Sequence, residues 1–519
     1  MAGSVPVAAD RKRLAGRLAR DGVAGLSVAF VLIPQSLAYA QLAGLPPERG
    51  LYAAALAPIA AAVAASSPYL QTGPTAITSL LVLGTLSSLS PIGGPEYVVL
   101  AALLAILVGG WRLLLGMVRG GSLAYLMSQP VLLGFTAGAS VLIIASQLPA
   151  VLGVGSASGN PLVGGWNALG GPASWSLGAI AFALAAAAVM ALGKRVSPLF
   201  PAVLVASIGA IAVSALSGYD GPVVGHVPAG LPALITGLPW GEVPALLVPA
   251  LVIALIGFAE PSAIARQYAA ADRHYWNPNR EMVSQGLANV AAGFGGGYAV
   301  GGSFSRTALN RLAGARTRAS GALTGALVLA FLPVAGLLAK LPTAVLGAVV
   351  ITAVIPLLDL RGARQFWAYS RVQAAVAAAT FGLTLALAPR LDRAVLIGIG
   401  LAVAVHLWRE LHVQVPTWTE GNTLHMRPNG VLYFASAPAI EERLTRSLAS
   451  HPDACRLVLH CDRLGRIDLT GALALRAVFA EAAQAGMKVE LVEVAPQARR
   501  IVSRVLPDLL GPVDRHSPR

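Results

Sequence analysis

One carboxylate stands alone in an apolar stretch of this 519-residue sequence. Glu260 is the one charged residue between positions 245 and 264, and Pro261 follows it. A carboxylate among hydrocarbon is costly to ionise, and ionisable residues in such stretches mark functional sites. We therefore expect Glu260 to take up a proton readily, more so beside a bound anion, which would suit it to carry protons. The alternative is a structural salt bridge to Arg306.

Two short segments have the composition of anion-binding helix starts. Residues 69–73 read as extended chain before a short helix at 74–88, and the glycine-rich residues 295–302 precede a second one at 303–312. A helix N-terminus offers unpaired N–H groups and about half a positive charge. The predicted donors are Thr75, with its hydroxyl, and Ala76 in the first helix and Ser303, Phe304 and Ser305 in the second.

Arg306 falls in the first turn of the second short helix. We expect it to add positive potential behind a bound anion, since intramembrane charges mark pathways. The alternative is that it points away and pairs with an acid or with backbone. One turn beyond Glu260, Ile264 offers no oxygen. Sodium needs several oxygen ligands, so the pattern favours a proton over sodium as the coupling ion.

The composition places these residues in a membrane. The chain is 56% hydrophobic and 12% charged, against about 25% charged in ordinary globular domains. Its net charge of +14 comes from basic residues near the ends of apolar segments, which membrane topology explains without nucleic acid. The sequence contains no recognisable nucleophile–base or metal-ligand cluster, so we predict neither an enzyme nor a metal site.

Candidate membrane-spanning segments number about fourteen, and the two short helices are among them although a full span needs roughly 20 residues. With the N-terminus inside, the basic residues fall in alternate loops, Arg112 and Arg119 sharing one of them. This pattern predicts a multi-pass protein of the cell membrane with both termini in the cytoplasm. The expected divisions are a cytoplasmic segment (1–21), a transport domain (22–411), and a linker with a soluble domain (412–519).

The two short helices take the third place in each half of the chain. Seven spans per half is an odd number, so the second half would enter the membrane from the opposite side. The two helix N-termini would then face each other near the midplane, and paired interruptions of this kind indicate a transporter's binding site. The alternative is that both are loop-flanked packing helices.

The composition of the chain changes after Leu411, where charged residues become frequent. Alternating strands (431–435, 456–460, 488–494) and helices (437–449, 467–485, 496–505) predict a small α/β domain. Thr470 lies at a strand-to-helix turn in the motif Asp468-x-Thr470-Gly471.

Several motifs resemble the sulfate-permease (SulP) family of anion transporters, in the family's order and across essentially the whole chain. They are AGLSV (24–28), IPQSLAYA (33–40), LAGLPP (42–47), GLY (50–52), TGPTA (72–76), NRE (279–281), QGLAN (285–289) and GSFSRTA (302–308). The Asp-x-Thr-Gly turn is similar to the signature of the STAS domain that follows the transport domain in this family.

The resemblance implies an inverted repeat of seven plus seven spans, divided into a core and a gate bundle, and a homodimer. It places Gln35 and Tyr39 in the cavity with the anion. In related soluble anti-sigma-factor antagonists a hydroxyl at the position of Thr470 is phosphorylated, whereas in transporters this turn is more often a structural cap. The STAS domain would dock a cytoplasmic protein partner or regulate turnover.

Together these features predict a secondary transporter of small anions in the lipid bilayer. The candidate substrates are carboxylates or dicarboxylates, sulfate and bicarbonate, carried with a proton and without another cofactor. Three alternatives remain open: a sodium-coupled bicarbonate or sulfate symporter, an uncoupled anion exchanger, and a membrane-anchored sensor that signals through its STAS domain.

Overall fold

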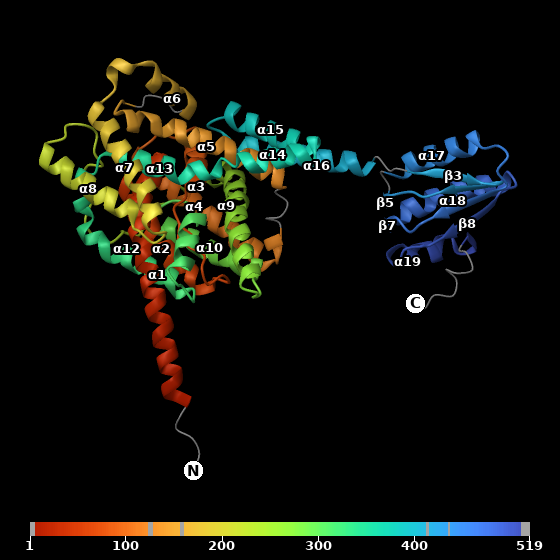
Figure 1. Cartoon of the computed structure of the whole chain (residues 1–519), viewed down its shortest axis with the longest axis horizontal. Helices are drawn as coiled ribbons and strands as arrows, with labels where there is room; N and C mark the ends of the chain where they lie inside the picture. Colours follow the sequence, from red (N-terminus) through yellow and green to blue (C-terminus); the bar gives the residue numbers. More distant parts are fainter. Residues whose placement is uncertain (1–5, 123–127, 156–159, 412–414, 434–435, 510–519) are drawn as a thin grey trace, which may run out of the picture. The chain divides into compact units, whose positions relative to one another are not determined.

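The computed structural model describes the chain except residues 1–5, 123–127, 156–159, 412–414, 434–435 and 510–519. It divides into two compact units, Met1–Gly400 and Leu401–Arg519 (Figure 1). The first is helical, and the second is a small α/β unit. Within the described residues, eight helices are long and apolar enough to cross a membrane.

The first unit contains two very short strands and a series of α-helices. In chain order these are α1 (Pro6–Leu42), α2 (Pro47–Ala64), β1 (Thr72–Gly73), α3 (Ala76–Leu86), α4 (Pro95–Met117), α5 (Gln129–Leu152), α6 (Pro161–Gly170), α7 (Leu177–Val196), α8 (Ala202–Ser217), α9 (Val243–Ala271), α10 (Pro278–Phe294), β2 (Gly301–Gly302), α11 (Phe304–Leu312), α12 (Ala319–Phe331), α13 (Thr343–Val354), α14 (Leu360–Tyr369), α15 (Arg371–Ala386) and the first half of α16 (Leu391–Leu411), which continues into the second unit.

Contacts between the helices define two packing groups. In one, α10 packs against α2 and α4, α9 against α4, and α12 against α1 and α2. In the other, α5 packs against α13 and α15, and α7 against α8 and α13. The short helices α3 and α11 both contact α1 and α9, so they belong to the first group. Fourteen spans in an inverted repeat stay a prediction.

Glycines allow α4 and α10 to approach closely. Gly109 and Gly116 lie on α4, and Gly286 and Gly293 on α10, each pair seven residues apart. A Cβ on Gly109 would lie 2.8 Å from the Gly286 carbonyl oxygen, and one on Gly293 would lie 2.6 Å from that of Ala102. Small residues at such spacing permit close helix packing in membranes, and here they bring the polar face of α10 into the interior.

The predicted loop position of Arg112 is wrong. The residue lies inside α4, five positions before its end, and its side chain is fully buried. The predicted end of this span came too early because it was placed at the first charged residue. An arginine that donates to backbone carbonyls can remain inside a helix bundle. Helix α15 begins at Arg371, where the Ser370 hydroxyl accepts a hydrogen bond from the Gln373 N–H.

The second unit contains two small sheets with helices between the strands. Its elements are β3 (Thr417–Glu420), β4 (Thr423–Met426), β5 (Gly430–Leu432), α17 (Ala437–Ser450), β6 (Arg456–His460), β7 (Leu464–Ile467), α18 (Leu469–Gln484), β8 (Lys488–Val492) and α19 (Pro496–Val505). One sheet has the order β3-β4-β6-β8, with β4, β6 and β8 parallel and β3 antiparallel to β4. In the other, β5 pairs with β7.

Candidate functional site

The lead-ins to the two short helices pair with each other as antiparallel strands. Thr72 of β1 lies opposite Gly302 of β2, and Gly73 lies opposite Gly301. A Cβ on Gly302 would lie 2.9 Å from the Pro261 side chain of α9, so the extended chain can pass there only as glycine. Segments more than 200 residues apart in sequence are thereby joined directly in front of α3 and α11.

Helix α3 begins at Ala76, two residues later than expected. Thr75 is its N-cap, with φ −134° and ψ 154°, and its Oγ1 accepts a hydrogen bond from the Thr78 N–H at 3.4 Å. The Thr75 and Thr78 hydroxyls also lie 2.8 Å apart. Pro74 therefore precedes the cap instead of opening the helix, because the threonine side chain satisfies a donor of the first turn better than a proline could.

Helix α11 begins at Phe304, with Ser303 as an N-cap whose side chain accepts no capping hydrogen bond. The Phe304 N–H instead donates to Glu260 Oε1 of α9, at 3.3 Å. The Ser303 and Ser305 hydroxyls lie 3.3 Å apart. The lone carboxylate of α9 therefore sits at the electropositive end of α11, the position where an anion is expected.

Arg306 connects the two short-helix segments. Its side chain is buried, with Nη2 donating to the Pro74 carbonyl at 2.7 Å and Nη1 donating to Gln35 Oε1 of α1 at 3.3 Å. Within the described part of the chain it forms no ion pair with Glu260, which removes the structural salt bridge as an explanation for either residue. The guanidinium pairs with backbone, as the alternative expected. It also lies beside the paired strands, in front of α3, where it can add positive potential.

The other two predicted residues lie on the helices that hold this region. Ala76 is the buried first residue of α3. Tyr39 is buried on α1, one turn after Gln35, and α1 packs against both α3 and α11. The structure thus gathers Gln35, the Thr75–Ala76 start of α3, the start of α11, Arg306 and Glu260 around β1 and β2. Their part in substrate binding stays a prediction.

A stripe of polar residues on α10 holds the paired strands from behind. Gln285 Nε2 donates to the Thr72 hydroxyl at 2.7 Å. The Asn289 side chain pairs with the Val300 backbone in both directions, at 2.9 and 3.1 Å. With Glu281 these residues repeat every four positions, which places them on one helix face. These residues were predicted only as members of two family motifs, although their four-residue spacing is visible in the sequence.

Glu281 fastens the segment between α2 and β1. Its Oε2 accepts hydrogen bonds from the backbone N–H groups of Ser66 and Ser67, at 3.1 and 2.7 Å, and from the Trp276 indole at 3.1 Å. The side chain is fully buried. Its role is therefore to position the lead-in to β1.

We expect Glu281→Ala to destabilise the protein by about 3 kcal/mol or more, because two buried donors and a half-buried one lose a charged acceptor. Thermal unfolding of the purified full-length protein measures the effect as a lowered melting temperature. Glu96→Ala, at the exposed start of α4, is the matched control and should change it little. Equal melting temperatures for the two variants would contradict the assigned role.

In the second unit, the helix cap at the Asp-x-Thr-Gly turn is the aspartate. Asp468 Oδ1 accepts a hydrogen bond from the Gly471 N–H at 2.7 Å at the start of α18, while Thr470 is exposed in the first turn. Asp468→Ala should cost about 1 kcal/mol of stability in this unit, as loss of an N-cap does, and Thr470→Ala should cost less. Chemical denaturation of the two variants, followed by the fluorescence of Trp418 in β3, compares their stabilities. Phosphorylation of Thr470 stays the untested alternative to a structural role of this turn.

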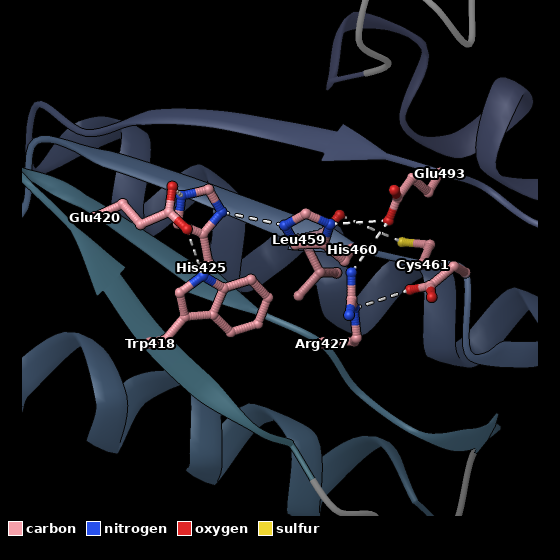
Figure 2. A network of polar contacts seen from close by, with 9 residues as sticks. Trp418, Glu420, His425, Arg427, Leu459, His460, Cys461 and Glu493 are labelled. Carbon is pink, nitrogen blue, oxygen red and sulfur yellow. Dashed lines mark hydrogen bonds and ion pairs between the residues drawn. The ribbon is translucent and has the colours of Figure 1, made fainter.

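A chain of polar side chains crosses the larger sheet of this unit (Figure 2). His425 Nδ1 lies 3.1 Å from His460 Nε2, and His460 Nδ1 lies 2.9 Å from Glu493 Oε2. Trp418 stacks on His425 with ring centroids 5.2 Å apart, and the Arg427 guanidinium lies over the indole and 3.6 Å from Glu493. These contacts join β3, β4 and β6 to the end of β8.

Comparison with known proteins agrees with the two units. Residues 18–380 match the model of the sulfate permease family, and residues 414–506 match that of the STAS domain. A probable sulfate transporter of Mycobacterium tuberculosis is 36% identical over 403 residues, which cover 76% of this chain and 70% of the relative. The sodium-independent sulfate anion transporter of Bos taurus is 29% identical over 93% of this chain and 85% of its own length.

Solved structures show the same fold. The murine anion transporter Slc26a9 superposes with a TM-score of 0.86 at 21% identity, over 96% of this chain and 89% of that one. The transmembrane domain of the cyanobacterial bicarbonate transporter BicA gives 0.65 at 24% identity, over 75% and 97%. The predicted fold class and family resemblance are thus confirmed: this chain is a multi-pass membrane protein that belongs to the sulfate permease family of anion transporters and carries a STAS domain.

Proposed function

We propose that the protein is a proton-coupled symporter of small anions, with the anion bound between the N-termini of α3 and α11. The observation that carries the proposal is the hydrogen bond from the Phe304 N–H to Glu260 Oε1 at 3.3 Å. Through this bond a titratable carboxylate occupies a backbone N–H group that would otherwise bind the substrate anion. Family membership supports transport of an anion, and the coupling is our own inference.

The coupling follows from competition for this donor. Ionised Glu260 occupies the Phe304 N–H and repels a second negative charge, whereas protonated Glu260 is neutral and a weaker acceptor. Proton binding therefore favours anion binding, and by linkage anion binding favours proton uptake to the same degree. A carrier whose binding site changes sides of the membrane when both the proton and the anion are bound moves the two together.

The remaining donors support an anion of several oxygens. Backbone N–H groups in the first turns of α3 and α11 point out of each helix start, and the hydroxyls of Thr75 and Ser303 stand beside them. The side chains at both caps are small. This favours carboxylates or dicarboxylates, sulfate and bicarbonate over a halide alone.

Uptake into liposomes tests the proposal. Purified full-length protein is reconstituted, and uptake of labelled sulfate, bicarbonate and succinate is measured with and without an inward proton gradient, in sodium and in choline. We expect at least one of these anions to accumulate with the proton gradient in choline. A requirement for sodium would replace the proton by sodium, pH-independent uptake would indicate an uncoupled exchanger, and anion binding without uptake would favour a sensor.

The remaining features of the proposal follow the family. We place the protein in the cell membrane with both termini in the cytoplasm, as a homodimer, and with a STAS domain that docks a cytoplasmic protein partner. Cross-linking in native membranes tests the dimer, and accessibility of an introduced cysteine in the STAS unit tests the orientation.

A further inference from the structure

A second buried arginine adjoins the candidate anion site. The Arg112 side chain of α4 is fully buried and donates only to backbone carbonyls: Nη1 to Val300 at 2.9 Å, Nε to Ala254 at 3.1 Å and Nη2 to Ile253 at 3.4 Å. Across the described part of the chain, no carboxylate lies within ion-pair distance of it. Each of its three nitrogens has a carbonyl partner, but no acid in the described ranges compensates its charge.

The surroundings of Arg112 lead directly to the start of α3. A Cβ on Gly257 of α9 would lie 2.4 Å from Arg112 Nη2 and 3.3 Å from the Thr78 methyl group. Thr78 lies in the first turn of α3, and its hydroxyl is 2.8 Å from that of Thr75. Val300, which accepts from Nη1, immediately precedes β2. The guanidinium therefore lies behind the paired strands and next to the first turn of α3.

The charges of the buried side chains around the site do not balance unless an anion is bound. Arg112 and Arg306 are buried and cationic, and the acid at the start of α11 is Glu260, which accepts from the Phe304 N–H. Glu281 of α10 is one turn from Gln285 and near the lead-in to β1, but its Oε2 accepts from three N–H groups there. It lies eight residues, or about 12 Å along the helix, before Asn289, which contacts Val300 beside Arg112. An uncompensated buried charge is strongly unfavourable. With Glu260 protonated, the side chains present two positive charges, which a divalent anion would neutralise.

We propose that Arg112 is a specificity-determining residue of the anion site, whose charge, added to that of Arg306, makes the site select divalent over monovalent anions. The inference rests on the proposed function and deepens it by naming the charge class of the substrate. Arg112 acts at a distance, through its potential, and does not touch the anion.

Anion charge separates this role from a structural one. The Coulomb energy between Arg112 and the guest is proportional to the charge of the guest. Loss of the arginine charge therefore changes the logarithm of the affinity twice as much for a dianion as for a monoanion. If Arg112 only fastened α4 to α9 and β2, its loss would weaken both anions by the same factor.

The experiment measures binding of sulfate and perchlorate, tetrahedral ions of charge −2 and −1, to the full-length protein in lipid nanodiscs at mildly acidic pH. In Arg112→Met we expect affinity to fall by about a hundredfold for sulfate and by about tenfold for perchlorate. Arg112→Lys, which keeps the charge, should hold the ratio of the two affinities within about threefold of the unaltered protein. Equal losses for both ions in Arg112→Met, or no loss, would overturn the proposal.

Two further outcomes are informative. If Arg112→Met does not fold, Gly257→Ala decides, because its Cβ would push against Nη2 and move the guanidinium while leaving the charge in the protein. We then expect the sulfate-to-perchlorate ratio to fall severalfold, and an unchanged ratio overturns the inference. If the unaltered protein binds neither ion, the inference about Arg112 fails while the proposed function stands or falls on the uptake of succinate and bicarbonate, whereas binding with an insensitive ratio rejects the role of Arg112 alone.

Discussion

We expect Glu260→Gln to abolish accumulation of the anion against its gradient under an inward proton gradient, while anion binding remains measurable. The amide cannot release or take up a proton, so the driving force has no route into the transport cycle. It resembles the protonated carboxyl group in size and charge, so the start of α11 stays open to the anion. We expect accumulation to fall more than tenfold and downhill exchange to change much less.

The pH dependence of binding gives a second readout. In the unaltered protein, lowering the pH neutralises Glu260, frees the Phe304 N–H and removes a repelling charge, so anion affinity should rise. In Glu260→Gln affinity should be high and independent of pH over the same range. The measurement is the dissociation constant of the transported anion at several pH values.

Glu242→Gln is the matched control for this prediction. Glu242 lies at the exposed N-terminal end of the same helix and forms no capping hydrogen bond. Its amide should leave both accumulation and pH dependence unchanged. If Glu260→Gln behaves like Glu242→Gln, the proton binds elsewhere and the competition at α11 has no part in coupling.

The interrupted helices could be predicted because their signals are local. A run of glycines before Ser303 and a Thr-Gly-Pro turn before Thr75 both disfavour continuous helix, and the structure contains separate short helices at both places. The pairing of their lead-ins could not be predicted. It depends on the contacts of β1 and β2 with α9 and α10, which join residues more than 200 positions apart.

Arg112 and the α10 stripe show a limit of reading charges one at a time. The assignment of Arg112 to a loop assumed that arginine stays outside the membrane, but three carbonyls from α9 and the β2 lead-in satisfy its donors. Glu281 was predicted only as a member of the family motif at 279–281, which gives it no structural role. The repeat Glu281, Gln285, Asn289 would have predicted a polar helix face, yet not the backbone groups it holds.

In the STAS unit, long amphipathic elements were predicted well and short strands were missed. The predicted helix at 496–505 and strand at 456–460 coincide with α19 and β6. Strands β3 and β4 have four residues each and are joined by the turn at Gly421, which has φ +58°. Four residues carry too little periodicity to identify a strand, although a glycine between two polar–apolar alternations was a usable hairpin signal.

Ser303→Leu should abolish anion binding, with affinity reduced more than a hundredfold, while Ser303→Ala should bind within a few fold of the unaltered protein. Ser303 is buried at the N-cap of α11, immediately before the Phe304 N–H, and its own side chain accepts no capping hydrogen bond. Leucine fills the space in front of the helix. Alanine removes only the hydroxyl and keeps every backbone donor.

Comparing Ser303→Leu with Ser303→Ala separates the contribution of the serine hydroxyl to anion binding from the need for space at this position. If backbone donors and the dipole of α11 hold the anion, side-chain size at Ser303 matters and its hydroxyl hardly does. A large loss in Ser303→Ala would make the hydroxyl the principal ligand. Full affinity in Ser303→Leu would place the anion away from α11, and the competition with Glu260 would lose its physical basis, since Glu260 would then share no donor with the substrate.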